Sequence, residues 1–499
     1  MTVTIDDRTP ILVGAGQVTA TQVDTAVQPP DLMATAARLA ADDAGGGRHL
    51  LLAVDTLATA NILCWPYVNP ARLTAERLGL HPAHEIYTAI GGNSPQMLVD
   101  TLATRIAAGD ARVALVTGVE AIRTVRRAVA AGHRIEWPKG HGTPEVLGDG
   151  RDGGSDHERR HGLAMPVEIY PLFENAYRAA RGWTIDEHRT RLGRLCSGLA
   201  ATAAAHPQGW TREPLTAEAI TTPSADNRMV AFPYPKRMTA NIDVDQAAAV
   251  LLTSVGGARA LGIAESRWVY LHGAAEAHDQ WLVSERADLA RSPAIAACTR
   301  GALAMAGVEA ARIDAFDLYS CFPCAVEIAA RELGIADDDP RPVSVTGGLP
   351  YFGGPGNNYS LHGIATMMDW LRARPGTFGM VTALGWYLTK HAVGVYGTEP
   401  PRRGWSGADD VQAEVDRVPP ARLAMEPRGA GTVETYTIVY GRDGAPERGT
   451  VLGRLDDGQR FVARLPDDPT LLAALTRSEG IGLGGRVVSA DGLGRFEPR

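Results

Sequence analysis

The turn Ile90-Gly91-Gly92-Asn93-Ser94-Pro95 lies where a reactive side chain would be easy to activate. An apolar run leads into this Gly-rich turn, and a helical stretch over residues 96–108 follows it. We expect Ser94 to cap that helix and Pro95 to occupy its first position. A helix N-terminus carries partial positive charge, which lowers the pKa of a cysteine thiol placed there. No cysteine stands in this turn, so any chemistry here needs a different group.

Few other residues have a spacing that suggests chemistry. Cys321 and Cys324 have the CxxC spacing, but one such pair without a second is a weak signal for zinc binding or redox chemistry. We therefore expect reduced thiols, no metal site and no permanently bound cofactor. His391, beside Lys390, is an alternative acid or base, although a lone histidine is more often structural.

Two further segments each allow two interpretations. The loop over residues 353–360 is rich in glycine and amide side chains. It could present backbone amides to an anion or a carbonyl group, or it could be a tight turn that needs positive φ angles. The basic residues Arg123, Arg126 and Arg127 suit phosphate groups, but a solvated charged face is the commoner explanation for such clusters.

The composition sets the class of protein. The chain has 499 residues, 45% of them hydrophobic, which is enough for two or three domains with buried cores. A formal net charge of -8 is small for this length and argues against general nucleic-acid binding. Residues 1–8 are polar, and no stretch is apolar for long enough to cross a membrane. We expect a soluble, cytoplasmic protein.

Apolar strands alternate with helices in two separate parts of the chain. The predicted strands cover residues 10–16, 113–119, 313–318 and 377–384, and the predicted helices cover residues 31–43, 292–306 and 363–373. Strands that are apolar on both faces indicate a parallel or mixed sheet covered by helices. The repeated pattern predicts a duplicated α/β core.

An inserted region and a C-terminal tail differ from this core. The insertion contains a polar run from Gly148, which we expect to be a mobile surface loop, and helices over residues 171–181 and 185–205. The tail follows a Pro/Gly-rich boundary and holds short alternating strands with an Asp443-Gly444 hairpin turn. These strands predict a small antiparallel β-barrel.

Taken together, these motifs resemble the thiolase family, near the sterol-carrier-protein-type thiolases, which are acetyl-CoA acetyltransferase-like acyltransferases of lipid metabolism. The resemblance extends over residues 10–397 and rests on residues 89–121, 241–263, 317–329 and 345–368. It implies a duplicated, five-layered thiolase fold with βαβαβαββ-type halves. The implied domains are residues 1–121 with 239–262, the inserted residues 122–238, residues 263–397, a linker over residues 398–430, and an additional barrel over residues 431–499.

The resemblance also implies which positions correspond to the catalytic groups of thiolases. The cysteine that takes the acyl group falls on Gly92, and the second cysteine, which moves a substrate proton, falls on Ala383. The activating histidine falls on Gly354, and the water-holding asparagine or histidine falls on Tyr319. Losing one member of such a set typically costs several orders of magnitude in rate. The thiolase reaction is therefore not expected.

The resemblance implies a thiolase-like pseudoenzyme that keeps a pocket for acyl-CoA or another acyl ligand. The expected pocket residues are Asn93, Ser94, Tyr319, Ser320, Cys321, Asn357, Asn358 and His391. Arg123, Arg126 and Arg127 would contact CoA phosphates, because thiolases hold CoA with the insertion at this place. No nucleic-acid partner is expected.

Two alternative functions stay open. One is an acyltransferase with relocated catalytic residues, drawn from Cys321, Tyr319 or His391. The other is a non-catalytic subunit that docks a protein partner through its barrel. Thiolases assemble as dimers or tetramers through the strand before the nucleophile helix, and the altered turn beside that strand leaves the oligomeric state open.

Overall fold

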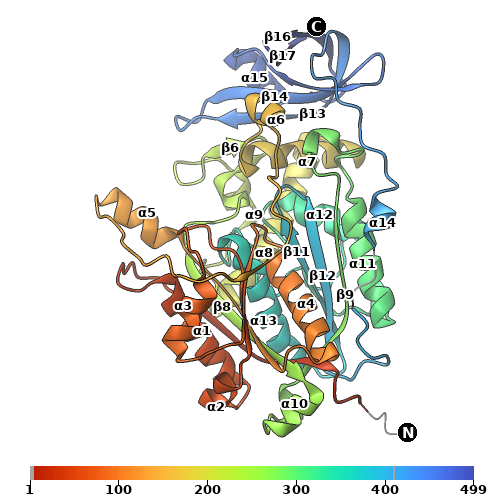
Figure 1. The fold of residues 1–499 in the computed structure, drawn as a ribbon. Coiled ribbons are helices and arrows are strands. Elements are labelled where there is room, and N and C mark those ends of the chain that lie inside the picture. Colours follow the sequence, from red (N-terminus) through yellow and green to blue (C-terminus); the bar gives the residue numbers. More distant parts are fainter. Residues whose placement is uncertain (1–4, 408–410) are drawn as a thin grey trace.

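The computed structural model describes residues 5–407 and 411–499. Figure 1 shows a large α/β core, an inserted region and a barrel at one end. Residues 1–4 of the predicted first half and residues 408–410 of the predicted linker lie outside the described residues. Within the described part, no helix combines the length and the apolar character needed to span a bilayer.

The core is built on one mixed sheet of ten strands. These are β1 (Pro10–Thr19), β2 (Thr56–Thr59), β3 (His84–Thr88), β4 (Val113–Ala121), β5 (Glu145–Leu147), β8 (Asp245–Ser254), β9 (Val269–His278), β10 (Ala315–Asp317), β11 (Phe378–Gly385) and β12 (Lys390–Gly397). Their order across the sheet is β10-β11-β12-β9-β1-β8-β4-β2-β3-β5. The two halves of the sheet join where Ile11 and Leu12 of β1 pair with Tyr270 and Val269 of β9.

Helices cover both faces of each half, which gives five layers. The outer helices of the first half are α1 (Pro29–Asp43) and α3 (Pro70–Leu78), with the short α2 (Gly47–Leu52) and α10 (Val255–Ala260) nearby; the middle layer is α4 (Ser94–Ala108) and α13 (Tyr359–Arg372); the outer helices of the second half are α11 (Pro293–Ala306) and α12 (Pro323–Glu332). Separate buried apolar clusters fill the spaces between these layers. The predicted five-layered, duplicated fold is confirmed.

Glycine residues on corresponding strands let the outer helices come close to the sheet. A Cβ atom on Gly16 of β1 would lie 2.1 Å from the backbone oxygen of Ala36 in α1. A Cβ atom on Gly273 of β9 would lie 2.1 Å from the backbone oxygen of Ala302 in α11. Only a residue without a Cβ fits at such a distance. The two halves therefore share the same close packing of strand and helix.

The inserted region lies between β4 and β8. Its further elements are α5 (Ile122–Ala130), α6 (Asp156–Arg160), α7 (Pro166–Ala180), α8 (Ile185–Ala205), α9 (Ala217–Thr221), β6 (Met229–Ala231) and β7 (Tyr234–Pro235). The predicted bounds of α8 are confirmed. The predicted start of α7 at Pro171 is wrong, because Pro166 is the proline near the helix start and Glu168 accepts hydrogen bonds from the amides of Ala164 and Met165.

The polar run from Gly148 is not a mobile surface loop throughout, so that prediction is wrong. Ser155 begins α6 with a capping box, in which its hydroxyl accepts from the amide of Glu158. The carboxylate of Glu158 in turn accepts from the amide of Ser284, 2.8 Å away. His157, Glu158 and His161 are buried as a result.

The C-terminal strands close into a barrel. They are β13 (Gly429–Tyr440), β14 (Pro446–Leu455), β15 (Arg460–Arg464), β16 (Gly484–Ala490) and β17 (Leu493–Pro498), with the short helices α14 (Gln412–Val415) before them and α15 (Pro469–Leu475) among them. β13 pairs with both β14 and β16, β17 pairs with β16 and β15, and β14 pairs with β15, which completes the ring. The predicted barrel is confirmed, although its β15–β17 contact is parallel rather than antiparallel.

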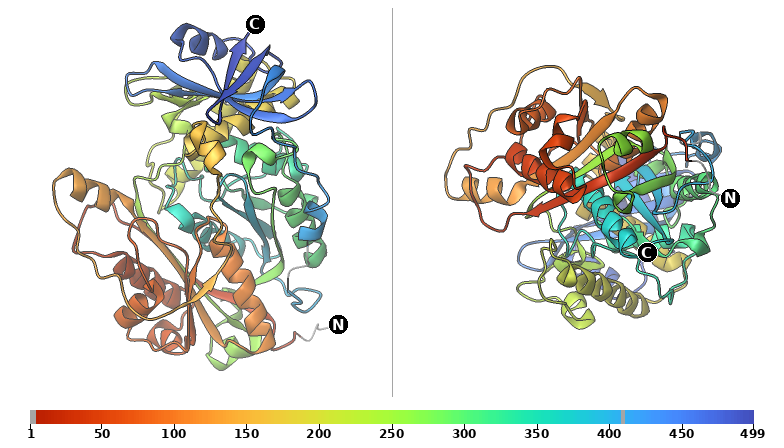
Figure 2. Two further views of the ribbon diagram at one scale, coloured as in Figure 1. Left: turned by 45° about the horizontal axis from the view of Figure 1, so that its top comes forward. Right: turned by 90° about the horizontal axis from the view of Figure 1, so that it is seen from below.

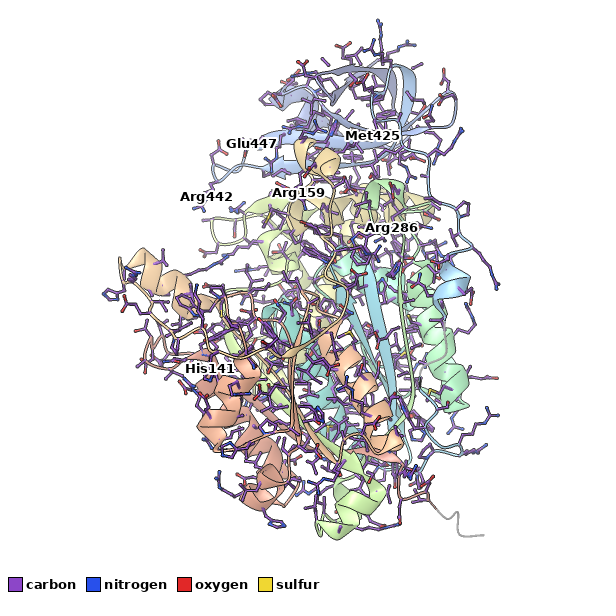
Figure 3. The ribbon with its side chains drawn as sticks, viewed as in Figure 1. His141, Arg159, Arg286, Met425, Arg442 and Glu447 are labelled. Carbon is purple, nitrogen blue, oxygen red and sulfur yellow. The ribbon has the colours of Figure 1, made fainter. Side chains whose placement is uncertain are left out.

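The barrel is docked on its own chain. Figure 2 shows the yellow helices of the inserted region directly beneath the blue barrel. The side chain of Asn175 on α7 donates to the backbone oxygen of Tyr436 at 3.0 Å, and Arg178 pairs with Glu479 at 2.6 Å. The buried guanidinium of Arg460 donates to the backbone oxygen of Arg286, which Figure 3 labels below the barrel. This face of the barrel is therefore already occupied.

Candidate functional site

The turn before α4 begins the candidate site. Ser94 is the first residue of α4, and its hydroxyl donates to the backbone oxygen of Ala89 at 3.2 Å. The prediction that Ser94 caps the helix is wrong, because Ser94 is itself helical and Asn93 holds the N-cap position without a side-chain hydrogen bond. Pro95 is the second residue of α4 and not the first, so that prediction is wrong by one position, although its missing amide still costs nothing within the first turn.

The space beside Gly92 is filled by protein atoms. A Cβ atom on Gly92 would lie 2.3 Å from the hydroxyl oxygen of Tyr319 and 2.4 Å from the backbone oxygen of Leu384. The Tyr319 ring also packs edge-on against Tyr359, with ring centroids 5.4 Å apart. Burial raises the pKa of Tyr319 far above its usual range, so the phenol stays protonated. Two positions that the resemblance assigns to thiolase catalytic groups, Gly92 and Tyr319, thus lie against each other, and the third, Ala383, is buried and precedes Leu384 on β11.

Gly354, the fourth of these predicted positions, lies in the glycine-rich loop over residues 353–360. Its amide donates to the backbone oxygen of Asn241 at 2.8 Å, and a Cβ here would lie 3.3 Å from that same oxygen, a tight contact, and 3.5 Å from the Cβ of Ala240. Gly353 and Gly356 have φ angles of 120° and 52°. Such angles favour glycine, so the interpretation as a tight turn accounts for the glycines of this loop.

The amide and hydroxyl groups of this loop support the turn at Gly92. The side-chain oxygen of Asn357 accepts from the amide of Gly91 at 3.0 Å, and its nitrogen donates to the backbone oxygen of Asn61 at 3.1 Å. The Ser360 hydroxyl donates to the backbone oxygen of Gly92 at 3.0 Å. These groups are engaged within the protein and fix the backbone of the turn.

Other predicted pocket residues near this centre have internal partners in part, but the buried Oδ1 atoms of Asn93 and Asn358 have none among the described residues. Ser320 accepts from the amide of Leu349 at 3.2 Å, and Asn358 lies 3.3 Å from Nε2 of His362. Burial raises the pKa of Cys321 to about 12. A thiol with that pKa is a poor nucleophile at neutral pH, which leaves Cys321 without the property that a relocated catalyst needs.

His391 belongs to a different buried cluster. Its Nε2 atom lies 3.1 Å from the backbone oxygen of Leu388 and 3.5 Å from the Asp279 carboxylate. Asp279 also accepts from the Ser292 hydroxyl at 2.5 Å and lies 3.7 Å from the Arg286 guanidinium. Burial alone would raise the pKa of Asp279, but the bond to His391 and the charge of Arg286 hold it below its usual value. His391 thus lies among the side chains that surround a buried carboxylate.

Lys390 contacts the turn before α4, although the sequence analysis named it only as a neighbour of His391. Its amine donates to the backbone oxygens of Ile90 at 2.5 Å and Asp149 at 3.0 Å. Burial lowers its pKa. A cavity of about 240 Å³ is lined by Lys390, His391 and Asn93. The one signal in the sequence was the rarity of lysine, which occurs three times in the chain.

A larger basic cavity of about 650 Å³ opens between α5 and the segment after β7. Arg126 and Arg127 line it and are exposed, and each lies 3.8–3.9 Å from the Asp243 carboxylate. Lys236 and Arg237 line the same cavity and had not been singled out, because they lie about a hundred residues later in the chain.

The inner wall of this cavity faces the loop that carries Gly354. Ala240 and Asn241 line the cavity and also contact Gly354 from the other side. Arg123, the third predicted phosphate contact, instead places its guanidinium 5.2 Å from the ring centroid of Trp210. The structure thus brings two of the three predicted arginines together and adds two basic residues to them.

Comparison with known proteins gives two specific matches. The model of the thiolase-like protein type 1 additional C-terminal domain matches residues 410–492. The crystal structure of a monomeric SCP2-thiolase-like protein type 1 from Mycobacterium smegmatis is 36% identical in sequence, with a TM-score of 0.86, and the match covers 99% of this chain and 100% of that chain. A search of curated proteins gave no match.

More distant structures share the fold alone. The Ltp2-ChsH2(DUF35) aldolase is 19% identical, with a TM-score of 0.62, and the match covers 78% of this chain and 98% of that chain. The acetyl-CoA acetyltransferase of Syntrophomonas wolfei is 17% identical, with a TM-score of 0.57, over 79% of this chain and 100% of that chain. A shared fold at this identity does not carry a shared reaction.

Proposed function

The chain belongs to the SCP2-thiolase-like proteins of type 1, and from this premise we propose that it binds acyl-CoA or a similar acyl ligand without catalysing the thiolase reaction. The observation that carries the proposal is the difference between the centre at Gly92 and the basic cavity lined by Arg126 and Arg127. The centre at Gly92 is filled by Tyr319, whereas the basic cavity beside it is open.

The first half of the proposal rests on the chemistry of acyl transfer. A thiolase needs a thiolate to take the acyl group and bases to move protons. Gly92, Gly354 and Ala383 carry no titratable group, and the phenol of Tyr319 stays protonated. No step of that reaction can be assigned to these four residues.

The second half rests on the charge of the basic cavity. CoA carries phosphate groups, and guanidinium groups bind phosphate through charge-assisted hydrogen bonds. Arg126 and Arg127 are exposed and lie 3.8–3.9 Å from Asp243, beyond hydrogen-bond distance. Such loose pairs contribute little, so an incoming phosphate can replace Asp243 as the partner of both arginines.

Isothermal titration calorimetry with CoA and acetyl-CoA tests the ligand. We expect binding by the unmodified protein and at least about tenfold weaker binding, or about 1.4 kcal/mol, after the double charge reversal Arg126→Glu with Arg127→Glu. The matched control is Arg134→Glu, which changes an exposed arginine of the same basic stretch, whose ion-pair partner in the described part of the chain is Glu136. No heat of binding at millimolar ligand, or equal losses in both variants, would remove the ligand from the proposal.

We also infer that the chain is a monomer. β5 pairs in parallel with β3, from Ile86 with Glu145 to Thr88 with Leu147. The resemblance to thiolases makes β3 the strand of their subunit contact, and here the chain itself covers that strand. The relative from Mycobacterium smegmatis is described as monomeric. Light scattering after size exclusion should give about the chain mass of 53.0 kDa, and twice that mass would contradict the inference.

The buried amine of Lys390 favours one second candidate, an acyl transfer with relocated chemistry. The amine would attack the thioester carbonyl carbon, the carbon–sulfur bond would break, and the thiol would leave with the amine's proton. Mass spectrometry after incubation with acetyl-CoA tests this reaction. An acetyl group on Lys390 that is absent from Lys390→Met would favour the second candidate, and no adduct favours the first.

A further inference from the structure

Three side chains with metal-binding atoms converge between three helices of the second half and the insertion. They are Glu174 on α7, His188 on α8 and Glu327 on α12. Nε2 of His188 lies 2.9 Å from Glu174 Oε1 and 3.5 Å from Glu327 Oε2, and all three ligand atoms lie within 4.8 Å of one another. Among the described residues, this is the one such group of three.

Neighbouring residues hold His188 and Glu174 in place. Thr184 caps α8 through a capping box with Glu187, which fixes the helix start one turn before His188. Trp183 packs against the His188 ring with centroids 5.7 Å apart. The Tyr234 hydroxyl donates to Glu174 Oε2 at 2.6 Å. Outer contacts of this kind orient the ligands in protein metal sites.

One oxygen of the cluster lacks a well-aligned hydrogen bond. Glu174 is fully buried, and its Oε1 atom lies 2.9 Å from Nε2 of His188 without a hydrogen bond of good geometry among the described residues. A buried carboxylate oxygen whose hydrogen bond is poorly aligned is costly. One imidazole also supplies at most one positive charge to two carboxylates. A cation bound between the three side chains would satisfy both this oxygen and the charge.

Basic side chains near the cluster have other partners. Arg178 on α7 pairs with Glu479, and Arg181 and Arg191 both pair with Asp337, at 3.1 and 2.7 Å. These guanidinium groups are therefore engaged outside the cluster, and the two carboxyl groups have one imidazole as their nearby basic partner.

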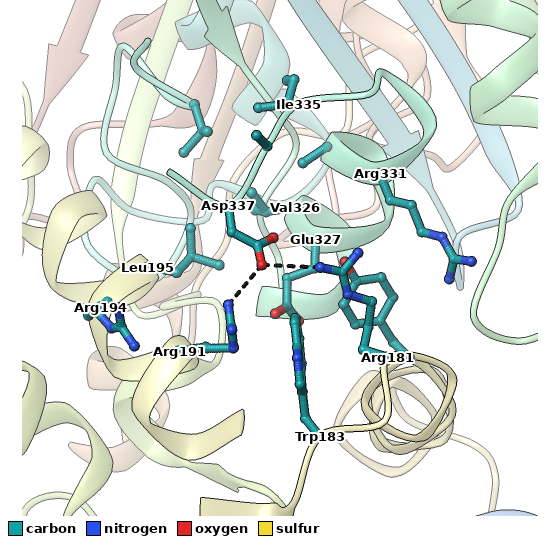
Figure 4. A pocket seen from close by; sticks show the side chains of 14 residues that line it. Arg181, Trp183, Arg191, Arg194, Leu195, Val326, Glu327, Arg331, Ile335 and Asp337 are labelled. Atoms are coloured by element: carbon teal, nitrogen blue, oxygen red, sulfur yellow. Dashed lines mark hydrogen bonds and ion pairs between the residues drawn. The ribbon is translucent and has the colours of Figure 1, made fainter. Parts of the chain in front are cut away.

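The cluster is reached from an open cavity. Glu327 is 12% exposed and lines a cavity of about 270 Å³, in which Figure 4 shows it among Trp183 and the arginines that bind Asp337. Arg194 and Arg331 add further positive charge to the same walls. An ion held by the cluster could thus take a fourth ligand from this side, such as water or a small carboxylate or phosphate.

We propose that Glu174, His188 and Glu327 form a binding site for one divalent transition-metal ion of the zinc class. One imidazole nitrogen and two carboxylate oxygens are ligands that zinc accepts, and three protein ligands leave an open fourth position. The sequence analysis expected no metal, because it weighed cysteine spacing, and these ligands come from three helices far apart in the chain. Protons are the competitor: burial and the charge of Glu174 raise the pKa of Glu327 to about 8.

The test is zinc binding by the full chain after EDTA treatment and dialysis at pH 7.5, measured by calorimetry and elemental analysis. We expect about one zinc ion per chain, and a loss of affinity greater than about 100-fold in Glu327→Gln and in His188→Gln, since outer-shell changes alone cost about 10–100-fold. Tyr234→Phe should fall in that outer-shell range. Asp337→Asn removes a carboxylate from the same cavity but no ligand, and should bind zinc as the unmodified protein does.

A measurement on the unmodified protein guards against variants that do not fold. Crystals soaked in zinc should show an anomalous peak between these three side chains. No zinc bound at micromolar concentration, an anomalous peak elsewhere alone, or equal affinity in folded Glu327→Gln would overturn the proposal and leave a proton-balanced cluster that supports the fold.

Discussion

Two buried regions of this chain differ in the titratable side chains that they contain. At Gly92, a position that the resemblance assigns to a thiolase cysteine, no titratable side chain is present and Tyr319 fills the space. Between α7, α8 and α12, Glu174, His188 and Glu327 converge, and one oxygen of Glu174 lacks a well-aligned hydrogen bond. The fold marks where thiolase chemistry would occur, yet the groups able to bind a cation or move a proton lie elsewhere.

The packing at this turn does not depend on a reactive side chain. α4 and α13 pack between the two halves of the sheet without needing a thiol at Gly92, because Asn357 and Ser360 hold the turn through hydrogen bonds. Function therefore has to be argued from the side chains at a site and not from the fold.

Truncation of Tyr319 should have the largest effect on the filled region. Tyr319→Ala deletes a buried ring and should lower the free energy of unfolding by about 3–5 kcal/mol. Tyr319→Phe keeps the ring and should stay within about 1 kcal/mol, because only one hydroxyl is lost. Urea titrations of both variants measure the difference. Equal losses would mean that the ring does not support the packing at Gly92.

A side chain at position 92 should be the next most damaging change. Gly92→Ala places a Cβ 2.4 Å from the backbone oxygen of Leu384, which cannot swing away as a side chain would. We expect a loss of about 3 kcal/mol, the upper end for overpacking. Gly198→Ala is the control: nothing lies within 4 Å of its Cβ in α8, and it should gain about 0.5–1 kcal/mol. Similar unfolding midpoints for the two variants would contradict the filled centre.

A smaller, pH-dependent effect should come from His362 in the middle layer. Burial, with a contribution from His206, lowers its pKa to about 3. Below about pH 6.5 this histidine binds a proton in the unfolded chain but not in the folded chain. The free energy of unfolding therefore falls as the pH drops below that value. At pH 5 the loss relative to pH 8 is about 2 kcal/mol for this group.

Urea titrations at pH 8 and pH 5 measure this effect. The loss between the two pH values should be smaller in His362→Gln than in the unmodified protein by about 2 kcal/mol. His141→Gln changes an exposed histidine, labelled in Figure 3, and should keep the original loss. The same pH dependence in all three proteins would show that His362 is protonated in the folded state.

Local patterns in the sequence predicted most of the fold. Apolar strands and capped helices gave the duplicated core, and α8 has its predicted bounds because Thr184 and Glu187 form a capping box at its start. Errors arose where two signals competed. Two prolines, Pro166 and Pro171, could each begin α7, and the buried α6 was hidden in a polar run whose contact with Ser284 is distant in the chain.

The candidate site was less predictable, because its decisive contacts join distant residues. The resemblance to thiolases placed Gly92, Tyr319 and Ala383 together, but nothing local showed that the Tyr319 ring would fill the centre. The basic cavity combines Arg126 with Lys236, and periodicity does not report such pairs. The roles of the predicted ligand residues stay predictions.

The cleavage of acetoacetyl-CoA in the presence of CoA tests the central claim most directly. The purified chain, followed by the formation of acetyl-CoA and by intact mass, should give a rate equal to that of buffer and no acylated protein. Turnover at about 1 s⁻¹ or faster, within the usual range of enzymes, would show that a group in this chain performs the chemistry that Gly92, Gly354 and Ala383 cannot.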